Sequence, residues 1–267
     1  MEKRYLTPKE VAQATIKSGV AKANLKSSHM LILGAFAGIF IGFGAYGDIV
    51  IMQTLKNIDV GLMKFFGALV FPVGLILVVM AGAELFTGNN LMTLAVMDKK
   101  ITLKQLLKNW VIVYIGNFIG SLLLVFVLLK ANLFSESATN LSINIAKAKM
   151  SLPFEVLFLR AILCNIIVVL AVWMATAAQD IISKIFACWF PIMLFVLSGY
   201  EHSIANMFFI PMGKVLGLST SWTHIFTINL IPVTLGNIVG GALIVPIAYY
   251  ICYVKNNKEK SKTFSAN

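Results

Sequence analysis

Long apolar runs dominate the chain and are separated by short polar connections. Six such units can be delimited: 30–52, 62–97, 108–130, 154–179, 184–217 and 225–254. A helix needs about 20 apolar residues to cross the hydrocarbon core of a bilayer, so four units have the length of one transmembrane helix. Units 62–97 and 184–217 are longer, because about 34 residues of helix extend roughly 50 Å against a core of about 30 Å. Each of these two units is therefore predicted to hold two shorter helices joined by a break.

The composition agrees with a chain that crosses a membrane several times. Hydrophobic residues make up 59% of the 267 residues and charged residues only 12%. A soluble domain of this size could not bury that much apolar surface. Segment 1–28 is too polar to act as a cleavable signal peptide. Cys164, Cys188 and Cys252 are scattered through apolar runs, which favours buried thiols over a disulfide or metal site, and no cofactor is expected.

Positive charge is concentrated in three segments. Residues 1–29 carry six basic against two acidic residues, residues 98–108 four against one, and residues 255–267 four against one. The remaining connections carry little net charge. Six spans with both termini in the cytoplasm place all three basic segments inside, as the positive-inside rule requires. Topology therefore explains the net charge of +11, and binding of nucleic acid is not expected.

The first segment has the features of a separate helix. The sequence TPKE places Thr7 at the N-cap and Glu10 at the third helical position, which matches a capping box. Apolar positions interspersed with lysines predict an amphipathic helix on the inner membrane surface. The predicted organisation is a cytoplasmic amphipathic helix over 1–29, a transmembrane domain over 30–254 and a cytoplasmic tail over 255–267.

The chain contains an internal repeat. AELFTGN carries Glu84 and Asn89, and YEHSIAN carries Glu201 and Asn206, with the same spacing in both. GNFIG follows the first stretch and GNIVG the second, and these glycines predict close helix packing with the asparagines as interhelical hydrogen-bonding residues. Three spans per copy mean that the second copy enters from the opposite face, as an inverted repeat. The two copies span about 30–130 and 154–254.

These motifs together resemble the formate/nitrite transporter family. The resemblance is carried by GAFAGIFIGFGA, AGAELFTGNNLM, KNWVIVYIGNFIGS, LRAILCNIIVVLAVWM, SGYEHSIANMFFIPMG and NLIPVTLGNIVGG, and it covers roughly residues 10 to 254. It implies an all-α, aquaporin-like channel protomer of six transmembrane helices, with helices two and five broken. It also implies a homopentamer in the bacterial cytoplasmic membrane, with one pore per protomer. Members pass small monovalent anions such as formate, nitrite, hydrosulfide, lactate and acetate.

The resemblance also assigns roles to individual residues. It implies one hydrophobic constriction formed by Phe71, Leu75, Leu85, Phe86 and Phe195. It places Thr87 on the substrate pathway, and Asn165 and Val168 near a second constriction. Lys149 resembles the lysine of the periplasmic vestibule. Because Lys147 lies only two residues away, the resemblance leaves open which of the two is the vestibule lysine.

The adjacent residues Glu201 and His202 lie in strongly apolar surroundings and suggest how an anion passes. A bare anion is costly to move through an apolar ring. Lys149 would attract the anion, while Thr87 and free amides at a helix start would hydrogen-bond to it. His202 would donate either a hydrogen bond or a proton, and a proton would let the neutral acid cross the constrictions. Both roles of His202 remain open at this point.

The repeat separates architecture from chemistry. The helix breaks are predicted to be supported by the repeated polar residues Glu84, Asn89, Glu201 and Asn206. Direct contact of either carboxylate with the substrate would repel an anion. His202 has no counterpart in the first copy, where Leu85 follows the glutamate, so His202 is the main candidate for chemistry.

Two other functions are compatible with a polytopic chain. An aquaporin-like pore for small neutral solutes is the main alternative, but its NPA signature is missing, and Lys149 with His202 favours anions. An enzyme is not expected, since the chain has three histidines and no HExxH, P-loop or GxSxG motif. The choice among formate, nitrite and hydrosulfide stays open because all three are small and monovalent. The choice between a channel and proton-coupled transport also stays open.

Overall fold

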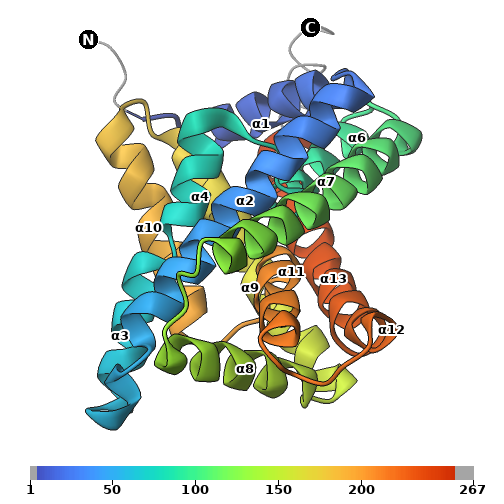
Figure 1. The fold of residues 1–267 in the computed structure, drawn as a ribbon. Helices are drawn as coiled ribbons and strands as arrows, with labels where there is room; N and C mark the ends of the chain where they lie inside the picture. Colours follow the sequence, from blue (N-terminus) through green and yellow to red (C-terminus); the bar gives the residue numbers. More distant parts are fainter. Residues whose placement is uncertain (1–4, 256–267) are drawn as a thin grey trace, which may run out of the picture.

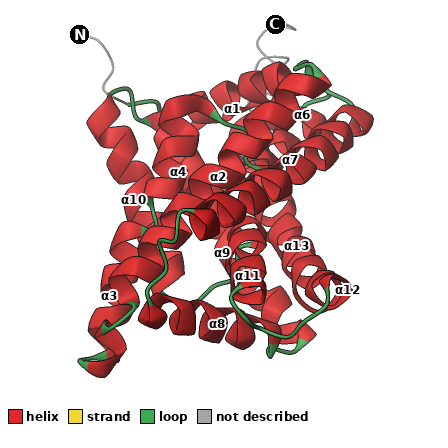
Figure 2. Cartoon of the chain, in the orientation of Figure 1, coloured by secondary structure: helices red, strands yellow, loops and turns green. Residues whose placement is uncertain are grey.

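The computed structural model describes residues 5–255 and is helical almost throughout. Figure 2 shows helices joined by short loops, and the described residues contain no strand, only an isolated bridge between Tyr5 and Ala178. The α-helices are α1 (Pro8–Ala23), α2 (Ser27–Met52), α3 (Val60–Val70), α4 (Val73–Leu77), α5 (Phe86–Asn89), α6 (Thr93–Met97), α7 (Leu103–Lys130), α8 (Glu136–Met150), α9 (Phe154–Ala177), α10 (Ile181–Leu197), α11 (Ser203–Val215), α12 (Trp222–His224), α13 (Ile231–Ile238) and α14 (Val245–Tyr249). Turns of 3-10 or π geometry connect or extend them: η1 (Leu55–Asn57), η2 (Val78–Gly82), η3 (Asn90–Met92), η4 (Ile225–Leu230), η5 (Val239–Ile244) and η6 (Tyr250–Lys255).

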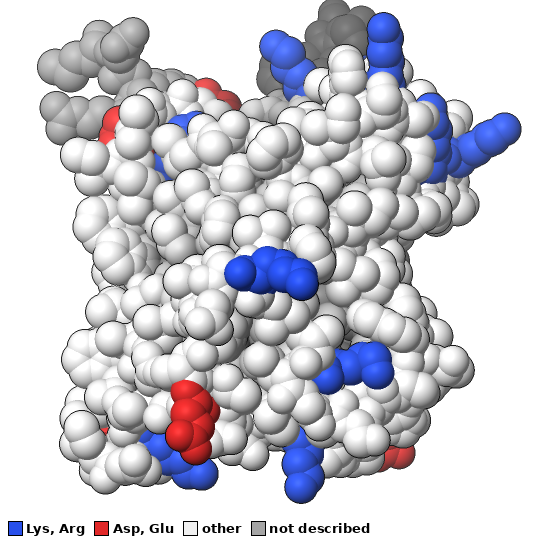
Figure 3. Space-filling view, in the orientation of Figure 1, with Lys and Arg blue, Asp and Glu red and all other residues white. Residues whose placement is uncertain are grey.

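Several helices have the character of membrane spans. In the described part of the chain, five stretches are long and apolar enough to cross a bilayer: Ser27–Asn57, Val60–Gly82, Leu103–Lys130, Phe154–Ala177 and Trp222–Lys255. Helix α10 is also apolar but shorter. On the face drawn in Figure 3, most of the surface is uncharged and the charged side chains gather mainly toward the two ends. The chain is therefore a multi-pass membrane protein.

Two close helix pairs depend on glycine. On α7, a Cβ at Gly116 or Gly120 would overlap backbone atoms of α2. At Gly236 and Gly240, a Cβ would overlap backbone carbonyls of α9 in the same way. The predicted role of the GNFIG and GNIVG motifs in close helix packing is thus confirmed, because the helix backbones approach only where a side chain is missing.

Helix α1 lies across one end of the molecule, and α8 lies at the opposite end (Figure 1). The Thr7 backbone N–H donates to Glu10 Oε2 at 2.9 Å, which confirms the predicted capping box. The apolar residues Val11 and Ile16 are buried against α6, η3 and η6. The amphipathic face predicted to lie on the membrane surface is therefore packed onto the protein itself. The predicted tail lies outside the described residues from position 256 onward.

Helical structure is interrupted at two related places. It stops at Gly82 at the end of η2 and resumes at Phe86, and it stops at Leu197 and resumes at Ser203. Both interruptions contain a glycine with positive φ, +86° at Gly82 and +69° at Gly199. L-residues with a side chain rarely adopt this conformation, so glycine lets the chain leave the helix sharply at both places. The two segments without helical structure are the places where the repeated glutamates lie.

Candidate functional site

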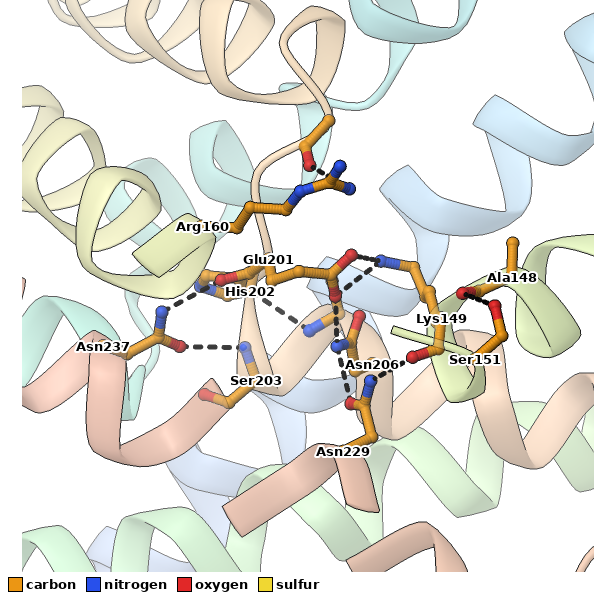
Figure 4. Close-up of polar contacts among 12 residues, drawn as sticks. Ala148, Lys149, Ser151, Arg160, Glu201, His202, Ser203, Asn206, Asn229 and Asn237 are labelled. Atoms are coloured by element: carbon orange, nitrogen blue, oxygen red, sulfur yellow. Dashed lines mark hydrogen bonds and ion pairs between the residues drawn. The ribbon is translucent and has the colours of Figure 1, made fainter. Parts of the chain in front are cut away.

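The first of two buried polar networks surrounds Glu201 (Figure 4). Lys149 Nζ, in the last turn of α8, donates to both carboxylate oxygens at 3.0 and 3.1 Å. Asn206 Nδ2, in α11, donates to Oε2 at 2.7 Å. The same amide nitrogen donates to Asn229 Oδ1 at 2.8 Å, and Asn229 Nδ2 donates to the Lys149 carbonyl at 2.9 Å. This network around one carboxylate thus joins α8, α11 and η4.

The second network surrounds Glu84 and closely resembles the first. Lys22 Nζ, in the last turn of α1, donates to Glu84 Oε1 at 2.7 Å. Asn89 Nδ2 donates to Glu84 Oε2 at 2.7 Å and to Asn109 Oδ1 at 2.9 Å. Asn109 Nδ2 in turn donates to the Lys22 carbonyl at 3.4 Å. Each network therefore contains one lysine, one glutamate and two asparagines, although Lys22 also donates to Asn89 Oδ1 at 2.9 Å, a bond that has no counterpart around Glu201.

Asn117 and Asn237 hold the interrupted backbone in both copies. Asn117 Nδ2 donates to the Glu84 and Gly34 carbonyls at 2.9 and 2.8 Å, and its Oδ1 accepts from the Phe86 N–H at 3.0 Å. Asn237 makes the equivalent three bonds, to the Glu201 and Ala161 carbonyls and from the Ser203 N–H. Each side chain satisfies backbone groups that a helix would otherwise pair. The predicted interhelical hydrogen bonding by these asparagines is confirmed.

The networks explain how carboxylates can lie in the apolar interior. Glu84 is 6% exposed and Glu201 is 4% exposed. A buried charge is costly unless a counter-charge and further hydrogen bonds surround it, and both glutamates have a lysine and an asparagine amide. Both oxygens of each carboxylate are therefore hydrogen-bonded within the protein. The lysines are correspondingly engaged, with side chains 28% exposed at Lys22 and 17% exposed at Lys149.

His202 is fixed in one neutral tautomer by its two neighbours. It is the N-cap residue of α11, and its Nδ1 accepts a hydrogen bond from the Ala205 backbone N–H at 3.1 Å. Since that backbone group is a donor, Nδ1 carries no proton. The ring proton is therefore on Nε2, which donates to Thr87 Oγ1 at 2.8 Å. This contact joins the starts of the two resumed helices, α5 and α11, in the buried centre of the protomer.

Two cavities approach this centre. The Glu201 cavity, of about 380 Å³, is lined by residues that include Lys149, Glu201, His202, Phe71 and Phe195. The Glu84 cavity, of about 530 Å³, is lined by residues that include Lys22, Glu84, Asn89, Leu75 and Leu85. Among the described residues, the two cavities share no lining side chain. The two cavities are therefore distinct.

The five residues expected to form one constriction belong to one buried apolar cluster, but they differ in the cavity that they line. Phe71 and Phe195 contact one another edge to face at the Glu201 cavity, with ring centroids 5.6 Å apart. Leu75 and Leu85 line the Glu84 cavity instead. Phe86 packs against Trp110 and Tyr114 and lines neither cavity.

Asn165 and Val168 lie in α9 and are fully buried. Asn165 Nδ2 donates to the Asn237 carbonyl at 2.7 Å and to Asn90 Oδ1 at 2.9 Å. Val168 belongs to the central apolar cluster, and neither residue lines either cavity. Thr87, also fully buried, reaches the site through its bond to His202.

Of the two lysines left open by the sequence, Lys149 is the one that reaches Glu201, and Lys147 is exposed to solvent. Sequence reasoning gave no role to Lys22, Asn109 or Asn229. The asparagines had a visible signal, because Asn109 precedes Asn117 and Asn229 precedes Asn237 by the same eight positions. Lys22 had no comparable signal in the sequence. The described residues contain no cluster of histidine, cysteine and acidic side chains that could hold a metal.

Comparisons with known proteins agree with this architecture. The family model described as "Formate/nitrite transporter" matches residues 9–251. The chain is 41% identical over 261 residues to the uncharacterized transporter YrhG of Bacillus subtilis, covering 97% of each chain. It is 36% identical to the formate channel FocA of Escherichia coli, covering 94% of this chain and 96% of FocA.

A solved structure described as a pentameric formate channel with formate bound superposes with a TM-score of 0.76 at 34% identity. The match covers 86% of this chain and 98% of that channel. The family model and the relatives both extend over nearly the whole sequence. The chain therefore belongs to the formate/nitrite transporter family.

Proposed function

We propose that the protein is a membrane channel for small monovalent anions of weak acids, with formate as the first substrate to test. The observation that carries this proposal is the pair of lysine-bearing cavities on either side of the buried His202–Thr87 contact. Relatives named as formate channels support formate. Nitrite and hydrosulfide have the same charge and similar size, and they belong in the same experiment.

The proposed architecture is an inverted repeat of six transmembrane helices with the second and fifth broken. The equivalent networks around Glu84 and Glu201 support it, and they extend the repeat to α1 and α8, which supply Lys22 and Lys149. Both termini are proposed to be cytoplasmic, which follows from the three basic segments. The Glu84 cavity is then the inner one and the Glu201 cavity the outer one.

The proposed assembly is a homopentamer in a bacterial cytoplasmic membrane, with a separate pathway in each protomer. The pentameric formate channel of similar fold supports this assembly. The apolar outer faces of α2 and α7, with Phe36, Phe43, Ile119 and Phe126 exposed, would then contact lipid or a neighbouring protomer.

The proposed pathway joins the two cavities past Thr87 and His202. An anion attracted by Lys149 has to cross Phe71 and Phe195 and then Leu75 and Leu85, where a bare charge is costly. Crossing as the neutral acid removes most of this cost. We propose these four residues as the hydrophobic barriers on the two sides of the central contact.

Of the two roles open for His202, the geometry supports hydrogen bonding. A second ring proton would have to be on Nδ1, and it would break the bond from the Ala205 N–H that caps α11. The Nε2–H can instead turn from Thr87 to the oxygen of a passing substrate without any change of charge. On this proposal the proton that neutralises the anion comes from outside the His202 ring.

The test uses the purified channel in proteoliposomes. Wild-type protein is expected to give rapid formate uptake, with nitrite and hydrosulfide compared at equal concentration, and no swelling in glycerol. His202→Asn is the sharp variant, because asparagine is a good N-cap but lacks a donor that can reach Thr87. It should keep the oligomer and lose most uptake. Glycerol permeation without anion uptake would refute the proposal in favour of a neutral-solute pore.

A further inference from the structure

Asp48 is a buried carboxyl group that the proposed mechanism does not use. It lies in α2, is 5% exposed, and lines the Glu201 cavity. Its Oδ1 is buried and has no hydrogen-bond partner among the described residues. Glu84 and Glu201, by contrast, each have a lysine and an asparagine. Asp48 is thus an acidic residue lining this cavity that, unlike Glu201, has no hydrogen-bonded lysine among the described residues.

The surroundings of Asp48 make space for the carboxyl group without pairing it. Gly67 of α3 faces it, and a Cβ at that position would overlap Asp48 Oδ1. The same Cβ would also overlap the Met52 sulfur, so an apolar side chain borders the carboxyl group on this side. An ionised carboxylate in such surroundings is costly, and the free energy favours the form that carries a proton. That form has an O–H with no partner in the fold.

Other charged and titratable groups face the same cavity from each neighbouring element. Lys64 comes from α3, Lys149 from α8, Arg160 from α9, and Tyr200, Glu201 and His202 from the segment before α11. Lys149 and Glu201 are bonded to one another, and His202 is held by Thr87 and Ala205. Lys64 and Arg160 are exposed at their positions, and Arg160 donates to the Gly199 carbonyl at 3.5 Å. These basic groups favour an anion in the cavity, and ionised Asp48 would oppose it.

We propose that the cavity between Asp48 and Lys149 is a binding site for a small monovalent oxyanion, with protonated Asp48 donating a hydrogen bond to it. Lys149 supplies the positive charge, and the hydrogen bond from the O–H of Asp48 orients the bound anion. Hydrogen bonds to an ionised acceptor are short and strong, so one donor has a large effect on affinity. The proposal rests on the proposed channel function and adds the group that holds the anion before it crosses.

The site has a specific pH signature. The anion binds only where Asp48 carries its proton, because the ionised form both loses the donor and repels the ligand. By linkage, the half-saturation concentration then rises by up to about tenfold for each pH unit above the titration of Asp48. An amide at this position would donate at every pH. Asp48→Asn should therefore remove this component of the pH dependence of half-saturation.

The experiment measures formate uptake into proteoliposomes between about pH 5 and 9 and extracts half-saturation and maximal flux separately. Glu155→Gln is the matched control, since Glu155 is an exposed carboxylate at the start of α9 that does not line the cavity. It should follow wild type. Asp48→Ser, which also donates independently of pH, serves if Asp48→Asn does not assemble.

The two proposals fail in different ways. If wild-type vesicles take up no anion, the proposed channel function is wrong and this site is overturned with it. If wild type and Asp48→Asn both take up formate with the same pH dependence of half-saturation, only the Asp48 site is overturned. The expected result is a flatter pH dependence of half-saturation in Asp48→Asn than in wild type and Glu155→Gln.

Discussion

Lys149→Met tests whether the lysine at the Glu201 cavity stabilises the protein as well as attracting anions. The substitution keeps a long side chain and removes the charge that holds both Glu201 oxygens at 3.0 and 3.1 Å. Removing one partner of a buried ion pair costs about 3–5 kcal/mol because the other charge is left without a counter-charge. The Asn206 bond to Glu201 remains, and Lys149 is partly exposed, so the lower end applies. We expect a loss of about 3 kcal/mol, or roughly a hundredfold in the folding equilibrium.

The assay is the midpoint of heat-induced loss of the oligomer in detergent, read by size exclusion. Lys147→Met is the matched control, because it removes the same charge two residues away from an exposed position. It should behave as wild type. The double variant Lys149→Met with Glu201→Gln removes both charges and keeps the acceptor for Asn206. We expect it to recover to within about 1 kcal/mol of wild type.

Two results would refute this reasoning. Equal midpoints for Lys149→Met and Lys147→Met would mean that the ion pair contributes nothing to stability. A double variant no more stable than Lys149→Met would mean that the cost does not arise from an unpaired Glu201. Reduced formate uptake in Lys149→Met with a normal midpoint would leave anion attraction as the sole role of this lysine.

Three further substitutions test the packing and the centre of the proposed pathway. Gly120→Ala pushes a Cβ into the Ala35 carbonyl of α2, so we expect a loss of about 1–3 kcal/mol in the same thermal assay; an unchanged midpoint would contradict the close packing. Thr87→Val removes the acceptor of the His202 Nε2–H at a cost of about 1–3 kcal/mol and should reduce formate uptake by an assembled oligomer. Full uptake would exclude Thr87 from the pathway. Asn237→Leu removes three buried hydrogen bonds, and we expect loss of assembly by size exclusion, whereas a stable oligomer would show that water replaces them.

The sequence predicted much of the fold because local rules act on each helix separately. Apolar length located the helical stretches, TPKE located the start of α1, and two Gly-Asn motifs located the close helix pairs. The packing of α1 was predicted less well. Its apolar face suits a membrane surface and a protein surface equally, and only the assembled helices show that it covers α6 and η6.

The candidate site was predictable only where both members of a contact were repeated in the sequence. Glu84 with Asn89 and Glu201 with Asn206 were visible because each pair is local. The lysines were not visible as a pair, since Lys22 precedes Glu84 by 62 positions and Lys149 precedes Glu201 by 52. The intervening loops differ in length, so spacing carries no signal. Phe71 and Leu75 are only four positions apart but line different cavities, and this difference cannot be inferred from their spacing.

The repeat also identifies where the two halves differ, and those differences point to the chemistry. The Glu84 N–H donates to the Leu33 carbonyl and the Glu201 N–H to the Arg160 carbonyl, so Leu33 of α2 and Arg160 of α9 are equivalent positions of the repeat. Counting from this pair, Asp48 is equivalent to Ala175. His202 is equivalent to Leu85, because each follows the repeated glutamate. Asp48, from the first copy, and His202, from the second, both line the Glu201 cavity, whereas their counterparts Ala175 and Leu85 are buried apolar residues. A network of lysine, glutamate and asparagine is present in both copies of the repeat, so we assign it to the architecture rather than to the chemistry. The groups that distinguish one side are Asp48 and His202, and an asymmetric step such as capture and neutralisation of an anion belongs where they lie.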